Sequence, residues 1–517
     1  MKITPSLFAL ILGLTSLTAF SQITTDKKTC TPCEQLKKVR LPDVTILEAT
    51  SVSKDTIPGE EGWSPTVVID RTFCRILGRI SKEIKFELLL PADWNGRFLM
   101  AGNGGFAGSI QNDLIGRLNE GYAVVGTDTG HKDTGDGAAW ALNNMERQLN
   151  FGSLAVHRTA EVSKALINSH YCEYPAYSYF LGCSRGGGQA MMEAQAYPED
   201  FDGIVAGAPA HNWPALGAKF VQTSQHMYPD PDDLSKPNLT LDHLKLLQAH
   251  VLKQCDDLDG LEDSILNDPR DCIFDFATLP MCPGNAAGTD CFTQEQLAAI
   301  QSVYSPLMVD NQEIYPGFPF GLEGEDTAWD LWITGTSPYL EGNPSLHHMF
   351  GTNIFKYLVF NDPSWDYSQY DFKNFAQETA FASSFLDATQ TNYSGLKDAK
   401  GKMILYHGWD DYAISAYATI QHYEKALLVD QELPSYIRLF MLPGVLHCAG
   451  GTGPDQVDWV KLISDWVENE NAPERVVVSK FEGGNLTMTR PVYPYPKVTV
   501  YKGSGDSTEE KNFGVKQ

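Results

Sequence analysis

Basic residues are scarce in this chain, and no long apolar run follows its first twenty residues. Lys and Arg together number 39 against 65 Asp and Glu, so the formal net charge is −26 over 517 residues. Because nucleic acid is bound through a basic face, this balance argues against nucleic acid as a partner. A bilayer span needs about 20 consecutive apolar residues, and since no stretch reaches that length we predict no membrane contact of this kind.

The cysteine pattern lacks a zinc site. Cys30 and Cys33 have the spacing C-x-x-C, but no second pair at metal-site spacing follows among the ten cysteines. Disulfides, which persist outside the cytosol, explain so many cysteines better.

The N-terminus indicates export as well. Lys2, an apolar run at 7–14 and small residues at 19–21 follow the order of a secretory signal peptide. We therefore predict a signal peptide over residues 1–21, cleaved after Ser21, and a secreted or periplasmic protein. No cysteine follows this cut, so a lipoprotein anchor is not expected.

The chain is long enough for several domains or for one large domain with an insertion. Segments typical of strands alternate with helical segments up to about residue 210, a pattern that predicts an α/β fold with a mostly parallel sheet covered on both faces. We expect residues 22–210 and 395–517 to form this core. Residues 211–394, rich in Pro, Asp, Trp and Tyr, are expected to form an inserted lid, and the polar tail from Gly503 to be irregular.

The most informative motif is G-C-S-R-G at residues 182–186, which matches the nucleophile elbow of α/β-hydrolases. Residues 177–181 are typical of a buried strand and residues 189–194 of a helix, which is the context that the motif needs. A plain Gly/Ser turn is the alternative. The context favours Ser184 as a catalytic nucleophile.

A serine nucleophile needs a histidine base and a carboxylate that orients the base. In this fold they follow the serine in the order acid, then histidine, each after a strand. His447 is the best base among the twelve histidines because it comes last and follows a predicted strand. Asp410 and Asp411 are both candidates for the acid, and residue chemistry alone does not separate them. His407 is expected to line the pocket or to pack beneath it.

An oxyanion hole requires two N–H groups aimed at the developing negative charge. We expect the backbone N–H of Arg185, the residue after the nucleophile, to supply one donor. The glycine-rich segment 102–106 is expected to supply the other, and it lacks the Lys-Ser/Thr of a phosphate-binding loop.

Cys183 precedes the serine and Cys448 follows the histidine. If the two catalytic residues meet, these cysteines are neighbours, so we expect a disulfide that holds nucleophile and base together. A nucleophilic Cys183 is the weaker interpretation, because adjacent residues in a tight turn point in different directions.

These residues resemble the tannase and feruloyl esterase family, which also contains the bacterial hydrolase of mono(hydroxyethyl) terephthalate. The marks are Cys183-Ser184 with His447-Cys448 and the H-G-W-x-D segment that ends at Asp411, and the likeness covers nearly the whole mature chain. The resemblance implies an α/β-hydrolase core, Asp411 as the acid, and Gly105 as the second oxyanion donor ahead of Gly104. It also implies disulfides Cys33–Cys74, Cys255–Cys272 and Cys282–Cys291, and it leaves Cys30 and Cys172 unassigned.

An acidic loop at 255–265 is as typical of a solvated turn as of a calcium site on its residues alone. The resemblance favours structural Ca²⁺ in the lid and implies no organic cofactor. The implied ligands are the side chains of Asp256, Asp259 and Asp263 and the carbonyls of Leu261 and Ile265.

The expected activity is a secreted serine carboxylesterase that acts on aromatic esters of the feruloyl type, small molecules attached in some cases to plant polysaccharide. Tannase or terephthalate monoester hydrolase activity is the alternative, and no residue matches the arginine that holds a free carboxylate in the terephthalate enzyme. A serine peptidase and a secreted non-catalytic binding protein are more remote alternatives. Ile414 is expected to face the acyl pocket. Six lid aromatics form either a platform over the pocket or the lid's own core: Trp329, Trp332, Tyr339, Phe350, Phe355 and Trp365.

Overall fold

The computed structural model describes residues 30–57, 66–132, 137–340 and 343–516. The predicted signal peptide and its cleavage point lie outside these residues. None of the helices in the described part of the chain combines the length and the apolar character that crossing a bilayer would require.

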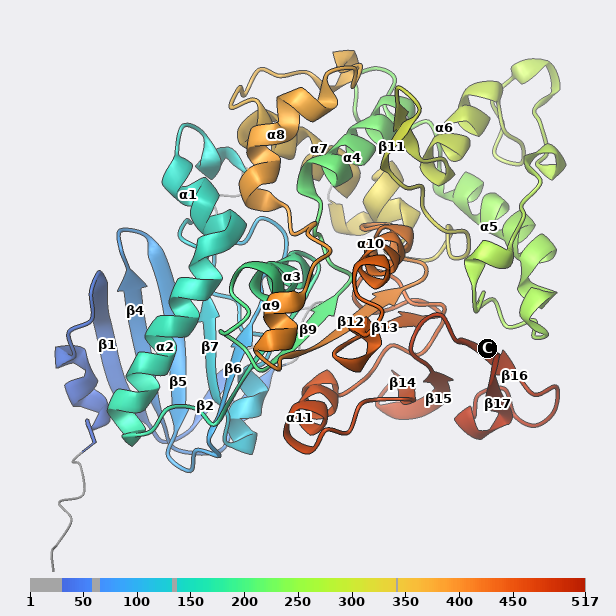
Figure 1. Ribbon diagram of the computed structural model, residues 1–517. Helices are drawn as coiled ribbons and strands as arrows, with labels where there is room; N and C mark the ends of the chain where they lie inside the picture. Colours follow the sequence, from blue (N-terminus) through green and yellow to red (C-terminus); the bar gives the residue numbers. More distant parts are fainter. Residues whose placement is uncertain (1–29, 58–65, 133–136, 341–342, 517) are drawn as a thin grey trace, which may run out of the picture.

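A nine-stranded sheet forms the centre of the fold (Figure 1), in the order β1-β4-β5-β7-β6-β8-β9-β12-β13. The first four strands of this order pair antiparallel, and every pair from β7 to β13 is parallel. This mostly parallel sheet confirms the predicted α/β fold class. The strands are β1 (Val44–Val52), β4 (Phe73–Ile80), β5 (Ile84–Pro91), β6 (Arg97–Ala101), β7 (Ala123–Thr127), β8 (Tyr177–Cys183), β9 (Gly203–Gly207), β12 (Lys402–Gly408) and β13 (Ile437–Leu442).

Helices cover both faces of the sheet, which is why its strands read as nearly continuous apolar runs. In β8, Tyr179 packs toward α11 and Phe180 packs toward α2 and α3, because successive strand side chains point to opposite faces. The core helices are α1 (Met145–Leu149), α2 (Ala155–Tyr171), α3 (Arg185–Ala196), α9 (Ser394–Asp398), α10 (Ala416–Val429) and α11 (Trp459–Asn469), with a π-helical turn, η4 (Asn150–Leu154), before α2.

The segment between β9 and α9, residues 208–393, is called the insertion below. Figure 1 shows its helices grouped at one end of the sheet, and their buried side chains form one hydrophobic cluster with residues of neighbouring core segments. The division into core and lid at residues 211 and 394 stays a prediction. The insertion contains α4 (Trp213–Met227), α5 (Leu241–Cys255), α6 (Gln294–Tyr304), α7 (Leu346–Asn353), α8 (Phe375–Leu386), β10 (Leu307–Val309) and β11 (Gln312–Tyr315).

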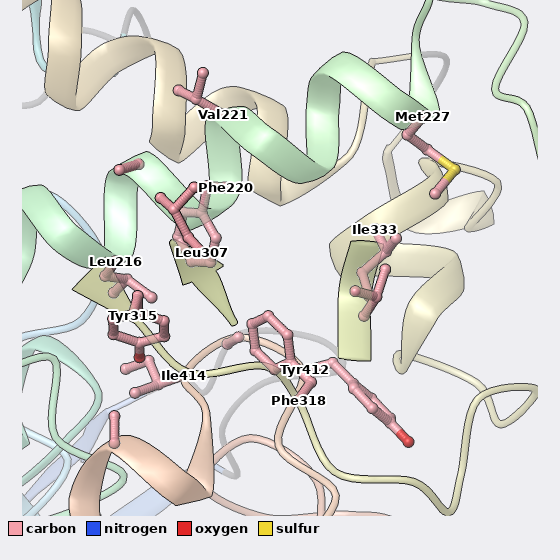
Figure 2. Close-up of a cluster of buried hydrophobic side chains, with 14 of the residues drawn as sticks. Leu216, Phe220, Val221, Met227, Leu307, Tyr315, Phe318, Ile333, Tyr412 and Ile414 are labelled. Carbon is pink, nitrogen blue, oxygen red and sulfur yellow. The ribbon is translucent and has the colours of Figure 1, made fainter. Parts of the chain in front are cut away.

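The insertion is packed onto the loop that follows β12. Figure 2 shows Leu216 and Phe220 of α4 close to Tyr315, and Tyr412 and Ile414 in the same group of side chains. All belong to one buried cluster. The loop that carries the predicted triad acid is therefore held by the hydrophobic core of the insertion.

The tail is more ordered than the sequence predicts. Two antiparallel hairpins follow α11, formed by β14 (Val476–Glu482) with β15 (Asn485–Val492) and by β16 (Val498–Tyr501) with β17 (Phe513–Lys516). Residues 503–509 form bends and turns, as the prediction of an irregular tail from Gly503 has it, but the prediction is wrong for Phe513–Lys516. Phe513 supplies a buried anchor there, with the Arg490 guanidinium 4.7 Å from its ring centroid. A short ribbon of β2 (Asp55–Ile57) and β3 (Val67–Ile69) lies near the N-terminus.

All ten cysteines are paired. The structure contains the bridge beside the serine and the three bridges that the resemblance implies, and it joins the two cysteines that the sequence left unassigned. The disulfides are Cys183–Cys448, Cys33–Cys74, Cys255–Cys272, Cys282–Cys291 and Cys30–Cys172.

Candidate active site

Ser184 lies in the turn between β8 and α3. Its backbone has φ 63° and its N–H donates to the Gly207 carbonyl at 3.0 Å. The turn requires small neighbours: a Cβ on Gly182 would lie 2.6 Å from the carbonyl carbon of Gly186. A non-glycine residue at positive φ costs free energy, and such strain is typical of functional sites. The turn places Ser184 before the N-terminus of α3, where helix N–H groups favour negative charge.

Two histidines donate to the same carboxylate oxygen. Oδ2 of Asp411 lies 2.8 Å from Nδ1 of His447 and 3.1 Å from Nε2 of His407. Oδ1 of Asp411 accepts the N–H groups of Ala413 and Ile414 at 2.8 and 2.9 Å. With Nδ1 of His447 bound to Asp411, its Nε2 is the nitrogen left for a serine proton.

The charge state of Asp411 follows from these donors. Burial by itself raises the pKa of the Asp411 carboxyl, but the charge of His447 and the hydrogen bonds from His407 and His447 outweigh it, so the pKa lies well below the ordinary value. Asp411 is fully buried and remains a carboxylate, as a residue that orients a histidine must.

His407 sits behind this carboxylate. It is fully buried, and its Nδ1 lies 2.8 Å from Oγ1 of Thr419. Of the two positions that the sequence allows for His407, the structure shows the one beneath the pocket, and its side chain is absent from the cavity wall formed by described residues.

The disulfide between Cys183 and Cys448 joins the two loops of the site, with the Cα atoms 6.0 Å apart. One cysteine is bonded to Ser184 in the chain and the other to His447. The bridge therefore restrains the elbow and the histidine loop, which are 265 residues apart in sequence, at the point where they meet.

The two candidate oxyanion glycines differ in what their N–H groups do. The Gly104 N–H donates to Oε1 of Gln111 at 2.5 Å. The Gly105 N–H makes no hydrogen bond to the residues that the structure describes, and Gly105 lines the cavity beside Ser184 and Arg185. This difference favours Gly105 as the donor.

Gln189 holds the glycine-rich loop in place, a role that the sequence did not reveal. From α3 its Oε1 accepts the Asn103 N–H at 2.9 Å and its Nε2 donates to Oδ1 of Asn103 at 3.1 Å. The clamp joins the oxyanion loop to the helix that begins after Ser184. The available signal in the sequence was a glutamine one turn into the helix that follows the elbow.

The cavity above Ser184 has an almost wholly apolar wall. Ile414 lines it, as do two of the six aromatics singled out from the sequence. Trp332 lies 5.1 Å from the His447 ring and 6.1 Å from Phe350 between ring centroids. The wall also includes Trp213, Leu216, Phe220, Ile354, Ala210 and Ala413, which the sequence gave no reason to select.

The other lid aromatics have different positions. Trp329 and Phe355 are fully buried in the insertion, and Trp365 is stacked on Phe355 with centroids 5.0 Å apart. Tyr339 is exposed. The six therefore divide into a pair over the cavity, a trio that packs the insertion, and one surface residue.

Comparisons with known proteins show the family of this chain. Residues 67–515 match the family model described as tannase and feruloyl esterase. The chain belongs to the tannase and feruloyl esterase family. It is therefore a carboxylic ester hydrolase of this family.

Three relatives show how far the likeness extends. The chain is 32% identical to mono(2-hydroxyethyl) terephthalate hydrolase from Piscinibacter sakaiensis, over 85% of this chain and 84% of the relative. It is also 32% identical to feruloyl esterase B from Aspergillus niger, over 85% and 86%. The crystal structure of feruloyl esterase B from Aspergillus oryzae superposes with a TM-score of 0.81 at 27% identity, covering 93% of this chain and 99% of that one. The family and the α/β-hydrolase fold predicted from the sequence are thus confirmed.

The acidic loop of this family member brings partly buried carboxylates together. Burial, with a contribution from the charge of Asp263, raises the pKa of Asp259 to about 6 and also raises that of Asp256. Arg490 donates to Oδ2 of Asp263 at 2.5 Å. Partly buried oxygen donors that repel one another are the chemistry that a hard cation stabilises, so the residues fit such an ion.

A second acidic group lies between α2 and α3, which carry His157 and Glu193. Ligand atoms of His157, Glu193 and Asp200 lie within 4.8 Å of one another, a spacing that could hold a metal ion. Nδ1 of His157 is 2.6 Å from Oδ2 of Asp200, and Nζ of Lys164 donates to the Asp200 carbonyl. These two groups already provide positive charge beside the carboxyls.

Proposed function

We propose that this chain is a serine esterase that hydrolyses esters of aromatic acids of the feruloyl type. The observation that carries the proposal is the disulfide that joins the neighbours of Ser184 and His447, because it brings an Asp411–His447 pair to an elbow serine that lines an apolar cavity. Trp332 of the cavity wall contacts the His447 ring. A non-catalytic binding protein would not need a fully buried carboxylate held by four donors at this position.

In the proposed reaction His447 takes the proton of the Ser184 hydroxyl at Nε2 while the oxygen attacks the ester carbonyl carbon. Asp411 keeps the imidazole in the required tautomer and stabilises the imidazolium. The N–H groups of Arg185 and Gly105 stabilise the tetrahedral oxyanion. His447 then protonates the departing alcohol, and an acyl-enzyme remains on Ser184.

Water completes the cycle. His447 removes a proton from a water molecule that attacks the acyl carbonyl, a second tetrahedral intermediate forms in the same oxyanion hole, and the free acid leaves as the proton returns to Ser184. The apolar wall around the acyl group keeps other water out of the cavity.

The substrate class rests on the wall of the cavity. An aromatic acyl group can stack between Trp332, Phe350 and Trp213. Arg185 is the one basic residue among the described residues of the wall, and its guanidinium donates to main-chain carbonyls of η4, which leaves it unable to pair directly with a free carboxylate. This favours a feruloyl or coumaroyl ester over the terephthalate monoester. A galloyl ester is the second candidate, supported by family membership.

We also propose a structural Ca²⁺ in the acidic loop. Asp256, Asp259 and Asp263 with the carbonyls of Leu261 and Ile265 would hold it, and it would supply charge compensation rather than chemistry. With five disulfides, an oxidising compartment is the proposed location, secreted or periplasmic, with plant polysaccharide as the carrier of the ester.

The test compares hydrolysis of methyl ferulate, methyl gallate and mono(hydroxyethyl) terephthalate by the wild-type protein and by Ser184→Ala. We expect kcat/KM to be highest for methyl ferulate and Ser184→Ala to lose about 10⁴-fold or more. Unchanged turnover in Ser184→Ala would overturn the mechanism, and faster turnover of the gallate or the terephthalate would replace the substrate class.

A further inference from the structure

Two fully buried cations in this protein have no carboxylate partner among the described residues, and they differ in how their donors are used. Lys219 on α4 donates to Oε1 of Gln222 and to the carbonyls of Ser302 and Ser305. These carbonyls are at the C-terminus of α6, where a cation is favourable. All three ammonium protons are engaged, so Lys219 is explained as a helix cap.

Arg185 is not explained in this way. Its Nη2 donates to the carbonyls of Phe151 and Gly152, the latter at 3.1 Å, in the π-helical turn η4. Its Nε and Nη1 are buried and make no hydrogen bond within the described part of the chain. The guanidinium also contacts two aromatic rings, with Cζ 4.4 Å from the Phe151 centroid and 5.3 Å from the Trp213 centroid.

Such an arrangement is costly. A buried charge without a counter-ion loses its hydration, and burial lowers the pKa of Arg185 to about 9, which still leaves the guanidinium charged at neutral pH. The two aromatic rings and two carbonyls recover only part of that cost. A merely structural role at this position would be served by a neutral side chain.

The position of the charge suggests its use. The backbone N–H of the same residue is the expected oxyanion donor, and Trp213, which contacts the guanidinium, lines the cavity with Ser184. The charge therefore lies within one side chain's length of the point where negative charge develops on the substrate. In a water-excluded site, a fixed charge at such a distance acts strongly.

We propose that the Arg185 side chain is the counter-charge of the oxyanion: a buried guanidinium that stabilises negative charge in the acyl cavity without touching the substrate. Ester substrates are neutral in the ground state and anionic in the tetrahedral intermediate, so the charge lowers the barrier more than it strengthens substrate binding. Arg185 thus acts on the oxyanion through the electric field of its charge, without contact with the substrate. This inference rests on the proposed Ser184 mechanism.

The test uses Arg185→Gln, which removes the charge, and Arg185→Lys, which keeps it. With methyl ferulate we expect Arg185→Gln to lower kcat by about 10- to 100-fold with KM changed by less than about threefold, and Arg185→Lys to stay within about fivefold of wild type. Lys219→Met serves as the control for loss of a buried cation away from the site.

A charge effect is separated from a change of shape by two inhibitors of the same outline. Ferulate is an anion and ferulamide is neutral. We expect Arg185→Gln to raise the inhibition constant of ferulate about tenfold and to leave that of ferulamide within about twofold of the wild-type value. Arg185→Lys and Lys219→Met should keep the wild-type ratio of the two inhibition constants.

Equal weakening of ferulate and ferulamide, or wild-type kcat in Arg185→Gln, would overturn the proposal. If Arg185→Gln does not fold, the inhibitor ratio in Arg185→Lys decides: loss of the ratio with the charge retained also overturns it. The Ser184→Ala variant keeps the two proposals separate, since its activity tests the mechanism whatever the Arg185 variants do.

Discussion

Two neighbouring carboxyl groups at the end of β12 are buried to the same depth and have opposite electrostatics. Asp411 accepts four hydrogen bonds, and its pKa is lowered. Asp410, adjacent in the chain, has no hydrogen bond of ordinary geometry to described residues, although the backbone of Leu322 and Gly444 approaches it. Burial, together with the charge of Glu323, raises its pKa well above the ordinary value.

Glu323 belongs to the same region as Asp410. It is fully buried in the insertion, its Oε1 accepts from Tyr304 at 2.6 Å and from the Gly321 N–H at 2.9 Å, and burial raises its pKa. The comparison shows that depth alone does not decide whether a carboxyl is ionised. The charge of His447 and the hydrogen bonds directed at Asp411 decide, and the protein directs both to the carboxyl that a histidine needs.

The strongest test of this comparison is removal of the Asp411 charge. We expect Asp411→Asn to lower kcat by about 10³- to 10⁴-fold, because the amide no longer holds His447 in the required tautomer. Steady-state hydrolysis of methyl ferulate measures it. Asp410→Asn is the matched control, and similar losses in both variants would contradict the distinction between the two residues.

Removal of the Cys183–Cys448 disulfide tests whether the position of His447, which donates to Asp411, depends on this bridge. We expect the double variant Cys183→Ala, Cys448→Ala to lower kcat by about 10- to 100-fold, since the two loops lose their common restraint. Removing Cys282–Cys291, which closes a loop with a sequence separation of only 9 in the insertion, should leave kcat within about twofold. The proposed role of the bridge fails if both double variants behave alike in turnover assays.

The acidic loop extends the comparison, because a cation bound from solution can compensate the charge of its carboxylates, whose pKa values are raised. If Ca²⁺ compensates these carboxylates, a chelator should lower the Tm of the wild type by several degrees, and Asp259→Asn should remove most of that response. Asp257→Asn in the same loop, at an exposed position, is the control. A Tm that does not respond to the chelator would exclude a stabilising ion.

The smallest expected effect is a gain in stability. Because the pKa of Asp410 and Glu323 is raised in the folded state, these carboxyls stabilise the fold below pH about 4, and that contribution is lost as the pH rises through the raised values. We expect Asp410→Asn to raise Tm by about 1 to 3 °C at pH 8 with no gain at pH 4. Thermal unfolding at the two pH values measures it, with activity within about twofold of wild type. A loss of Tm at both pH values would show that the carboxylate is needed.

Much of the fold was predictable because its signals are local. The alternation of strands and helices, the glycines around Ser184 and the cysteines beside Ser184 and His447 are each visible within a few residues. The tail was mispredicted because its hairpins depend on packing between Phe513 and Arg490, which local composition does not show.

The site was predictable in its residue types and less so in their partners. Gly104 and Gly105 look alike in sequence, and only the Gln111 side chain, folded back onto Gly104, distinguishes them. Trp213 and Phe220 line the cavity from α4, and nothing in their own sequence neighbourhood marks them.

The sequence by itself determined the α/β core and the residues at the ends of its strands, because short-range sterics and strand periodicity are written in adjacent residues. Tertiary structure alone decided which donors surround Asp411, which aromatics face the cavity, and that the guanidinium of Arg185 lies buried between two rings without a carboxylate. These outcomes depend on side-chain directions from separate segments of the chain, and packing sets those directions only when the whole chain has folded.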